Sequence, residues 1–234
     1  MIKAVLFDFG QTLVDSSAGF KLAEKTAQEK IFHDLGVSQR DGFMSHYRRI
    51  RKEHHGSSSF SRPAMWNELY YYYCAVSDTA KLLEWETEYW ETVKANSVPF
   101  PETMAVLQEL SKSYKLGLIS NTQGQKSSGA HRLELFPRIE HYFSAIIISG
   151  EGDIPPKPHC QPFRLCLSQL GVKPEEVVHV GDDWRIDICG AQGVGIHPVW
   201  LKHYSVKLNW PQVETHVPVI DSLDKLPDIV RRIN

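Results

Sequence analysis

The chain has 234 residues, of which 42% are hydrophobic, and this is enough apolar material for one sizeable core and a smaller second one. The formal net charge is only −2, so the chain lacks the basic surface that nucleic-acid-binding proteins carry. No stretch approaches the roughly twenty apolar residues of a membrane span, and the short apolar run at the N-terminus ends at an acid. We therefore expect a cytoplasmic protein that partners neither nucleic acid nor membrane.

The chain opens on a short apolar run, Ala4–Phe7, which is typical of a strand buried on both faces. Asp8 follows this run directly and begins a turn that contains glycine and threonine. Because ligands in open α/β sheets bind just beyond the carboxyl ends of the strands, Asp8 is expected at a sheet edge that faces a crevice. Asp and Gly are also common turn residues, so this stretch alone equally allows Asp8 to be a turn cap.

Residues 15–97 contain no β-branched runs and place large apolar residues at helical spacing. Four helices are predicted: the first ends at Gly36, the second begins near Ser38, the third has Pro63 in its first turn, and the fourth is capped by Asp78. Between the second and third helices, residues 54–59 are expected to form a loop. The segment is therefore predicted to be an all-helical domain.

Four consecutive tyrosines, residues 70–73, lie within the third predicted helix. Consecutive positions point to all sides of a helix, so one face cannot bury all four rings. Some of the rings must meet another surface, which is either the rest of the chain or a second copy of it. The aromatic-rich segment therefore offers a surface for a homodimer, although core packing explains most of its aromatic residues equally well.

After Phe100 the pattern changes to an alternation of helices and strands. Strands are predicted at residues 116–119, 145–148, 177–180 and 196–200. The alternation predicts right-handed crossovers and a mainly parallel sheet with helices on both faces. We therefore expect an α/β fold with a Rossmann-like core of residues 1–14 plus 98–234 and an inserted all-helical cap domain of residues 15–97. The insertion leaves the core beside Asp8, where a lid over a site would lie.

Polar groups gather at the ends of four predicted strands. They are Asp8 with Thr12, Ser120 with Asn121, Lys157, and the acidic group Asp182, Asp183 and Asp187. Several carboxylates in one crevice repel each other unless a cation joins them, and oxygen ligands beside a phosphate suit Mg²⁺. A lysine, a hydroxyl and backbone amides complete a set that can hold a phosphate group. The sequence therefore predicts a site for Mg²⁺ and phosphate at one edge of the sheet.

This ordered set of motifs resembles the haloacid dehalogenase-like superfamily. Asp8-Phe-Gly-Gln-Thr12 is similar to the first motif of that family, Ser120-Asn121 to the second, Lys157 to the third, and Gly181-Asp182-Asp183 with Asp187 to the fourth. The helical stretch between the first two motifs resembles the cap of the family, and residues 218–226 resemble its C-terminal tail. Each motif alone is common by chance, but their joint order and spacing over nearly the whole chain are specific.

The resemblance implies a hydrolase with a small phosphorylated substrate. Asp8 would attack phosphorus and form an aspartyl-phosphate, while Thr12 would orient the Asp8 carboxylate. Ser120 and Asn121 would bind the substrate, with the Ser120 hydroxyl on the phosphoryl oxygens. Lys157 would bind substrate as well, since it would neutralise charge on both the nucleophile and the phosphoryl group.

The resemblance also implies a Mg²⁺ cofactor. The metal residues would be Asp8, Gly10 through its backbone carbonyl, Asp182 and Asp187, the last of which would position metal-bound water or the lysine. Asp183 either joins the metal site or caps the helix that follows it. Hydrolytic dehalogenases need no metal and lack the Gly-Asp pair of the fourth motif, so the pair in this chain favours the branch that transfers phosphoryl groups.

One position departs from the family pattern. The related phosphatases carry a second Asp two residues after the nucleophile, where it acts as general acid toward the leaving group and then as base for water. In this chain that position is Gly10, and the next is Gln11, whose amide can hydrogen-bond water but cannot take its proton. A positioned acid or base is typically worth about 10² to 10⁴ in rate, so we expect a slow phosphatase.

Three functions remain open from the sequence. The leading one is a Mg²⁺-dependent hydrolase whose leaving group needs little protonation, such as an acyl phosphate, or whose cap supplies the missing acid. The second is a phosphonatase-like carbon–phosphorus hydrolase, a branch that also lacks the second Asp but uses a cap lysine, which no motif marks in this chain. The third is a binding or regulatory protein that keeps the metal and phosphate groups but has lost turnover.

Overall fold

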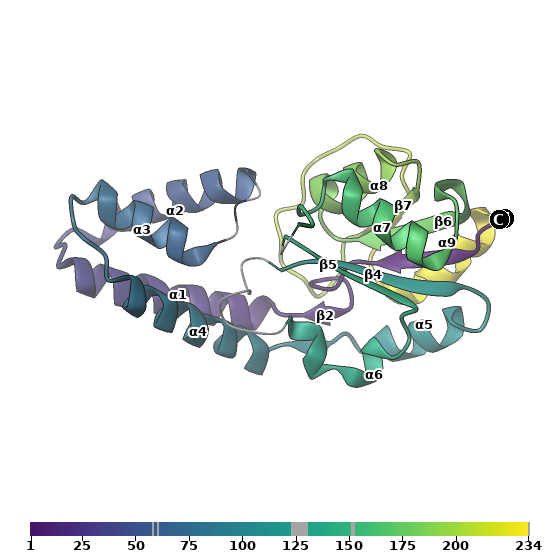
Figure 1. Ribbon diagram of the computed structural model, residues 1–234, viewed down its shortest axis with the longest axis horizontal. Coiled ribbons are helices and arrows are strands. Elements are labelled where there is room, and N and C mark those ends of the chain that lie inside the picture. The colour runs from purple at the N-terminus through teal and green to yellow at the C-terminus, as the bar shows by residue number, and fades with distance from the viewer. Residues whose placement is uncertain (58, 60, 123–130, 151–152, 234) are drawn as a thin grey trace. The chain divides into compact units, whose positions relative to one another are not determined.

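The structure is a computed structural model that describes residues 1–57, 59, 61–122, 131–150 and 153–233. The chain divides into two compact units (Figure 1). The α/β unit consists of Met1–Ser16, Val98–Asn121 and Arg132–Asn234, and the helical unit consists of Ser17–Ser97 with the described ends of Thr122–His131. In the described ranges, no helix combines the length and the apolar character that crossing a membrane requires.

Six parallel strands form the sheet of the α/β unit, in the order β5-β4-β1-β6-β7-β8. Their bounds are β1 (Ala4–Phe7), β4 (Lys115–Asn121), β5 (Ala145–Ser149), β6 (Val177–Gly181), β7 (His197–Leu201) and β8 (Val219–Ile220). The predicted α/β fold with a mainly parallel sheet is therefore confirmed. Strand β1 lies between β4 and β6, and the Asp8 amide extends the pairing by donating to the Val180 carbonyl at 3.0 Å.

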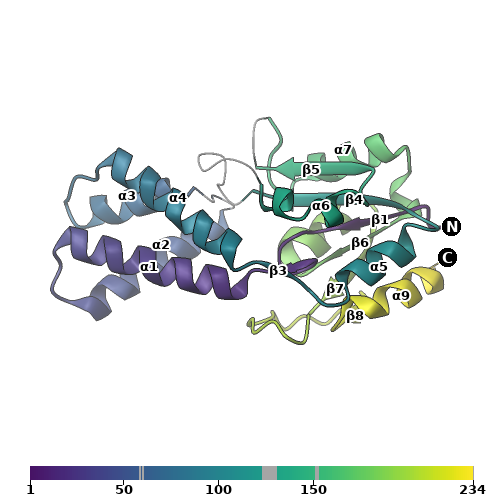
Figure 2. The ribbon, with the colours of Figure 1, turned by 90° about the horizontal axis from the view of Figure 1, so that it is seen from below.

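Alternate residues of β1 point to opposite faces of the sheet, and all of them are apolar. Both faces are therefore covered by helices. Val5 and Phe7 belong to one hydrophobic core, and Ala4 and Leu6 belong to the other. The first core is closed by α5 (Thr103–Leu110), α6 (Pro137–Glu140) and α9 (Leu226–Ile233), and the second by α7 (Cys160–Leu170) and α8 (Cys189–Gln192). Figure 1 shows α7 and α8 on the side of the sheet opposite α5 and α6, and Figure 2 shows α9 beside α5.

Short helical turns complete the α/β unit. They are the 3₁₀ turns η2 (Arg132–Leu135), η3 (Pro174–Glu176) and η5 (Leu223–Lys225), and the π-helical turn η4 (Trp184–Ile188). A two-stranded antiparallel ribbon, β2 (Val14–Asp15) with β3 (Val98–Pro99), lies where the chain leaves this unit and returns to it. The ribbon ties the two connections together just after the loop that follows Asp8.

The helical unit contains α1 (Ser17–Leu35), α2 (Arg40–Gly56), α3 (Arg62–Tyr72) and α4 (Thr79–Ala95). Predicted boundary signals act as expected: Gly36 is in the left-handed region at φ 63° after α1, and the Asp78 side chain accepts from the amides of Ala80 and Lys81 at the start of α4. Gly19 lets α1 approach α4, because a Cβ there would lie 2.9 Å from the backbone of Val93.

The prediction of a loop at residues 54–59 is wrong for residues 54–56. His54, His55 and Gly56 form the last turn of α2, and Ser58 lies outside the described residues. The reason is tertiary contact, since His54 Nε2 lies 2.7 Å from Glu68 Oε2 of α3, which favours continuing α2 by one more turn.

The tyrosine run of α3 divides between core and surface. Tyr70 is buried in the core of the helical unit, whereas Tyr71 is 83% exposed. The rings of Tyr72 and Tyr73 pack around His46, with centroid distances of 4.1 and 5.8 Å. The rings therefore point to several sides of α3, as consecutive helical positions require.

Candidate active site

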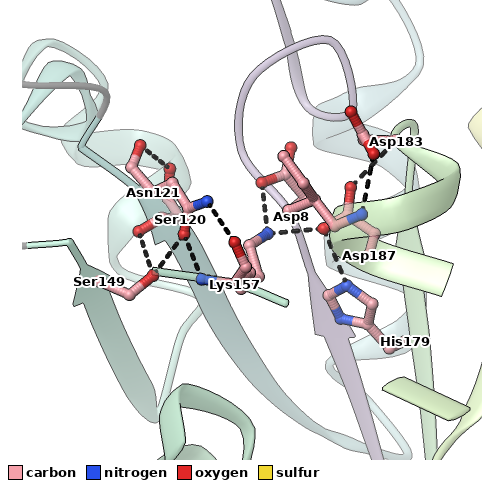
Figure 3. A network of polar contacts seen from close by, with 9 residues as sticks. Asp8, Ser120, Asn121, Ser149, Lys157, His179, Asp183 and Asp187 are labelled. Carbon is pink, nitrogen blue, oxygen red and sulfur yellow. Dashed lines mark hydrogen bonds and ion pairs between the residues drawn. The ribbon is translucent and has the colours of Figure 1, made fainter. Parts of the chain in front are cut away.

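Asp8 and Lys157 form the centre of the site (Figure 3). Asp8 directly follows β1, as predicted. The prediction that Lys157 ends a strand is wrong, because β5 ends at Ser149 and Lys157 lies in the loop before α7. The Lys157 Nζ donates to Asp8 Oδ1 at 2.8 Å and to Asp187 Oδ1 at 2.6 Å, and all three residues are buried. The fold thus brings together three predicted site residues from three separate segments of the chain.

The side chain of Asn121 binds the backbone of Lys157. Its side-chain Oδ1 accepts from the Lys157 amide at 2.9 Å, and its Nδ2 donates to the Lys157 carbonyl at 3.1 Å. The Ser149 hydroxyl, at the end of β5, donates to the same Oδ1 at 2.6 Å. The side chain of Asn121, predicted to bind substrate, is therefore engaged in positioning the lysine loop.

Asp187 holds Lys157 from the other side. Its Oδ1 lies 3.3 Å from His179 Nε2, and its Oδ2 accepts from the Asp183 amide at 3.1 Å. The side chain can come this close to the sheet only because position 181 is glycine, since a Cβ there would lie 2.3 Å from Asp187 Cγ. Asp183 itself accepts from the Ile186 amide at 2.8 Å, so the structure places it as the cap of η4.

The charges of the site are unevenly balanced. Burial raises the pKa of Asp8 to about 6, although Lys157 acts in the opposite direction. Burial also raises the pKa of Asp182 well above its ordinary value, and the charges of Asp8 and Asp187 add to the rise. Burial acts to raise the pKa of Asp187 as well, but Lys157 and His179 outweigh it and lower that pKa to about 2. One lysine is therefore not enough cation for this group of carboxylates.

The carboxylates could hold a metal ion. One oxygen from each of Asp8, Asp182 and Asp187 lies within 4.8 Å of the others. The raised pKa values of Asp8 and Asp182 are what burial of carboxylates without enough positive charge produces. A divalent cation would relieve this repulsion, and a donor set made only of oxygens suits a hard cation such as Mg²⁺. The residues present therefore fit the ion that the sequence predicts.

The other predicted residues lie around this centre. Ser120 is buried as the penultimate residue of β4, and its carbonyl accepts from the Ser149 hydroxyl at 3.2 Å. Thr12 is fully buried, and its hydroxyl has no hydrogen-bond partner among the described residues. Gly10 forms an isolated bridge with Val14, which fixes the loop that follows Asp8.

Three residues of this region are not among those that the sequence predicts. His179 is fully buried in β6 with its ring 5.3 Å from that of Phe163, and a polar residue within the apolar run of β6 was a signal that could have found it. Ser149 and Arg132 gave no such signal. Arg132 is buried, and its Nη2 would lie 3.1 Å from a Cβ at position 10, so two segments far apart in the chain approach each other there.

Comparison with known proteins gives the family of this chain. The family model described as haloacid dehalogenase-like hydrolase matches residues 2–195. The glyceraldehyde 3-phosphate phosphatase of Methanothermobacter thermautotrophicus is 29% identical, with 98% of this chain and 100% of that protein covered. The protein of the same name from Methanopyrus kandleri is 30% identical, with 100% of this chain and 99% of that protein covered.

A solved structure shares the fold along the whole chain. The HAD phosphatase from Thermococcus onnurineus superposes with a TM-score of 0.67 at 24% identity, and 98% of each chain is covered. Full-length agreement of this kind places the sheet, the helical insertion and the strand ends in the same order. This chain belongs to the haloacid dehalogenase-like hydrolases.

Proposed function

We propose that the protein is a Mg²⁺-dependent phosphatase that acts on a small phosphorylated metabolite through phosphorylated Asp8. The observation that carries this proposal is the ion pair between Asp8 and the buried Lys157, at 2.8 Å. A carboxylate at a strand end, beside a fixed cation, has both the nucleophilic oxygen and the positive charge that phosphoryl transfer needs. The names of the relatives, which are phosphatases of a small phosphorylated sugar, support the substrate class.

The proposed roles follow from the contacts of each residue. Lys157 orients Asp8 and offsets the negative charge of the phosphoryl group. Asp187 and Asn121 position Lys157, because Asp187 binds its ammonium at 2.6 Å and Asn121 binds both sides of its backbone. Asp8, Asp182 and the Gly10 carbonyl would hold Mg²⁺, which supplies charge neutralisation for the phosphoryl oxygens when bound.

We further propose that the helical unit is a cap that selects the substrate. The ribbon of β2 and β3 begins directly after the loop that carries Gly10 and Thr12, so both connections to the helical unit start beside the proposed nucleophile. The change between units falls at Ser16 and Ser17 on the outward connection and at Ser97 and Val98 on the return. An insertion at this point is placed to control access to Asp8.

A substrate panel with and without Mg²⁺ tests the proposal. Phosphate esters, acyl phosphates and a phosphonoaldehyde are offered to the wild-type protein, to Asp8→Asn, and to Asp224→Asn, a control at an exposed acid of the same unit. We expect release of phosphate that needs Mg²⁺, is lost in Asp8→Asn and is kept in the control. Hydrolysis that survives Asp8→Asn, or that proceeds equally after removal of Mg²⁺ by a chelator, contradicts the proposal.

A further inference from the structure

The guanidinium of Arg132 occupies the space beside Gly10. Arg132 begins η2 and is 1% exposed, and its Nη1 donates to the Ser16 hydroxyl at 2.9 Å. Its Cζ lies 5.6 Å from the ring centroid of Phe9. A Cβ built on Gly10 would lie only 3.1 Å from Nη2, so the guanidinium lies where a side chain at position 10 would begin. All four residues belong to the α/β unit.

Position 10 lies two residues beyond Asp8, on the loop that the bridge between Gly10 and Val14 holds in place. The guanidinium therefore lies against the two residues that follow Asp8 in the chain, Phe9 and Gly10. In this protein the group is a cation rather than an acid. A guanidinium cannot give up a proton at neutral pH, but it presents five N–H donors in a planar fork that matches pairs of oxygen atoms.

We propose that Arg132 binds the leaving group of the substrate and stabilises it as an oxyanion, in place of protonating it. The inference rests on the proposed function of Asp8. In the first step an Asp8 oxygen forms a bond to phosphorus, and the electron pair of the phosphorus–oxygen bond that breaks goes to the leaving oxygen. Arg132 donates hydrogen bonds to that oxygen, which takes any proton it needs from water. Water then attacks the aspartyl-phosphate and releases phosphate and the Asp8 carboxylate.

This role selects a class of substrate. A leaving group that departs as a stable anion needs no acid, and a carboxylate is such an anion. Carboxylates also match the guanidinium fork with two parallel hydrogen bonds, which is a strong and directional contact. Arg132 therefore favours acyl phosphates, which release a carboxylate, over alkyl phosphates, which release an alkoxide.

A series of substituted phenyl phosphates tests the role, because the pKa of the phenol sets how much charge the leaving oxygen must carry. The measurement is kcat/KM for wild type, Arg132→Met and Arg132→Lys with Mg²⁺ present. In Arg132→Met we expect a loss of about 10²- to 10³-fold for the least acidic phenol, as for removal of one donor that stabilises a developing oxyanion, and the smallest loss for the most acidic. Arg132→Lys keeps the positive charge but not the planar fork, so its kcat/KM should lie between those of wild type and Arg132→Met.

The slope of rate against phenol pKa separates this role from a structural one. The inference is overturned, with Asp8 still the nucleophile, if Arg132→Met loses the same factor in kcat/KM for every phenyl phosphate. It is also overturned if wild type has equal kcat/KM for acetyl phosphate and for an alkyl phosphate. Activity that survives Asp8→Asn would instead overturn the proposed function. Thermal unfolding of each variant shows whether a uniform loss comes from misfolding.

Gly10→Asp is a second variant that leaves Arg132 in place. Its new carboxylate would lie against Nη2, and the ion pair would lower its pKa and leave no proton to donate. We expect the rate of Gly10→Asp to depend on the pKa of the leaving phenol at least as steeply as the rate of wild type does. In the double variant Gly10→Asp with Arg132→Met, the new carboxyl group has no guanidinium beside it and can donate a proton to the leaving group. Its kcat/KM for the least acidic phenol should exceed that of Arg132→Met by about 10²-fold. A shallower slope in Gly10→Asp alone overturns the inference.

Discussion

Gly181 controls how close Asp187 comes to the end of β6. A Cβ at position 181 would lie 2.5 Å from Asp187 Cβ and 2.3 Å from its Cγ, so no larger residue fits without moving Asp187. Asp187 in turn binds the Lys157 ammonium at 2.6 Å and lies near His179. The absence of one side chain therefore maintains the position of the lysine beside Asp8.

Gly181→Ala should lower kcat by about 10²-fold, because a displacement of about 1 Å among catalytic groups costs that much. Steady-state kinetics on a substrate identified from the panel measures the loss. The matched control is Gly42→Ala in α2, where an added Cβ meets nothing within 4 Å. It should leave kcat unchanged and stabilise the helix by up to about 1 kcal/mol. Equal kcat values for Gly181→Ala and wild type would show that Asp187 does not position the lysine.

The sequence names candidate residues for the site but not the contacts between them. Asp8 was recognisable as an acid at the end of an apolar strand, and Lys157 by its motif. The contacts of Asn121 with the Lys157 backbone were not predictable, because they depend on how two loops meet in space. Arg132 had no signal either, since its approach to position 10 exists only after the sheet has formed.

The last turn of α2 carries a partly buried histidine, His55. Burial lowers the pKa of His55 to about 4, and the charges of Arg51, Arg62 and His54 act in the same direction. An unfolded histidine has a pKa near 6.5, so below that pH the unfolded chain binds a proton that the folded chain excludes. The folded state of the helical unit is therefore expected to lose stability as the pH falls from 6.5 toward 4.

Urea unfolding at pH 7.5 and at pH 4.5 measures this loss. The contribution of His55 to the change is expected to be about 3 kcal/mol at most, from the difference between the two pKa values. His55→Gln removes the titrating group and should reduce the pH dependence by that amount. If the variant and wild type lose the same stability between the two pH values, the destabilisation arises from other groups.

At the level of elements, periodicity and boundary residues predict the helices and strands whose pattern lies within their own residues. The four helices of the helical unit and five of the six strands of the sheet follow from such signals, as Gly36 and Asp78 illustrate, whereas the two-residue strand β8 does not. The ribbon of β2 and β3 was not predicted, because each strand has two residues and pairs with a distant segment. The extra turn of α2 through Gly56 depends on contact with α3, which a local pattern does not contain.

The molecule as a whole contains separate hydrophobic cores in its two units. Trp66 and Trp90 lie in the core of the helical unit, and Phe163 lies in a core of the α/β unit. Each unit is therefore expected to have its own unfolding transition.

Calorimetry of two variants tests this independence. Trp66→Ala removes a fully buried ring and should destabilise the helical unit by about 3 to 5 kcal/mol, and Phe163→Ala should do the same to the α/β unit. Each variant should shift one transition, and Mg²⁺ should raise only the transition that Phe163→Ala lowers. A single transition that both variants shift equally would mean that the units unfold together.

The change of pattern near residues 15 and 97 predicts two domains, and their bounds stay a prediction. Composition and periodicity allow such a prediction because helical and alternating segments differ in their local pattern. They do not suffice for the chemistry, which depends on the small number of contacts that join Asp8, Lys157 and Asp187.

Phosphorylation of Asp8 is the most direct test of the central claim. Wild-type protein and Asp8→Asn are mixed with acetyl phosphate and Mg²⁺, quenched in acid within the first turnover, and digested for peptide mass spectrometry. We expect one phosphoryl group on the wild-type peptide that contains Asp8, decaying as phosphate is released, and none in Asp8→Asn or without Mg²⁺. Hydrolysis of acetyl phosphate at full rate with the phosphoryl group on another residue, or on none, would contradict the account.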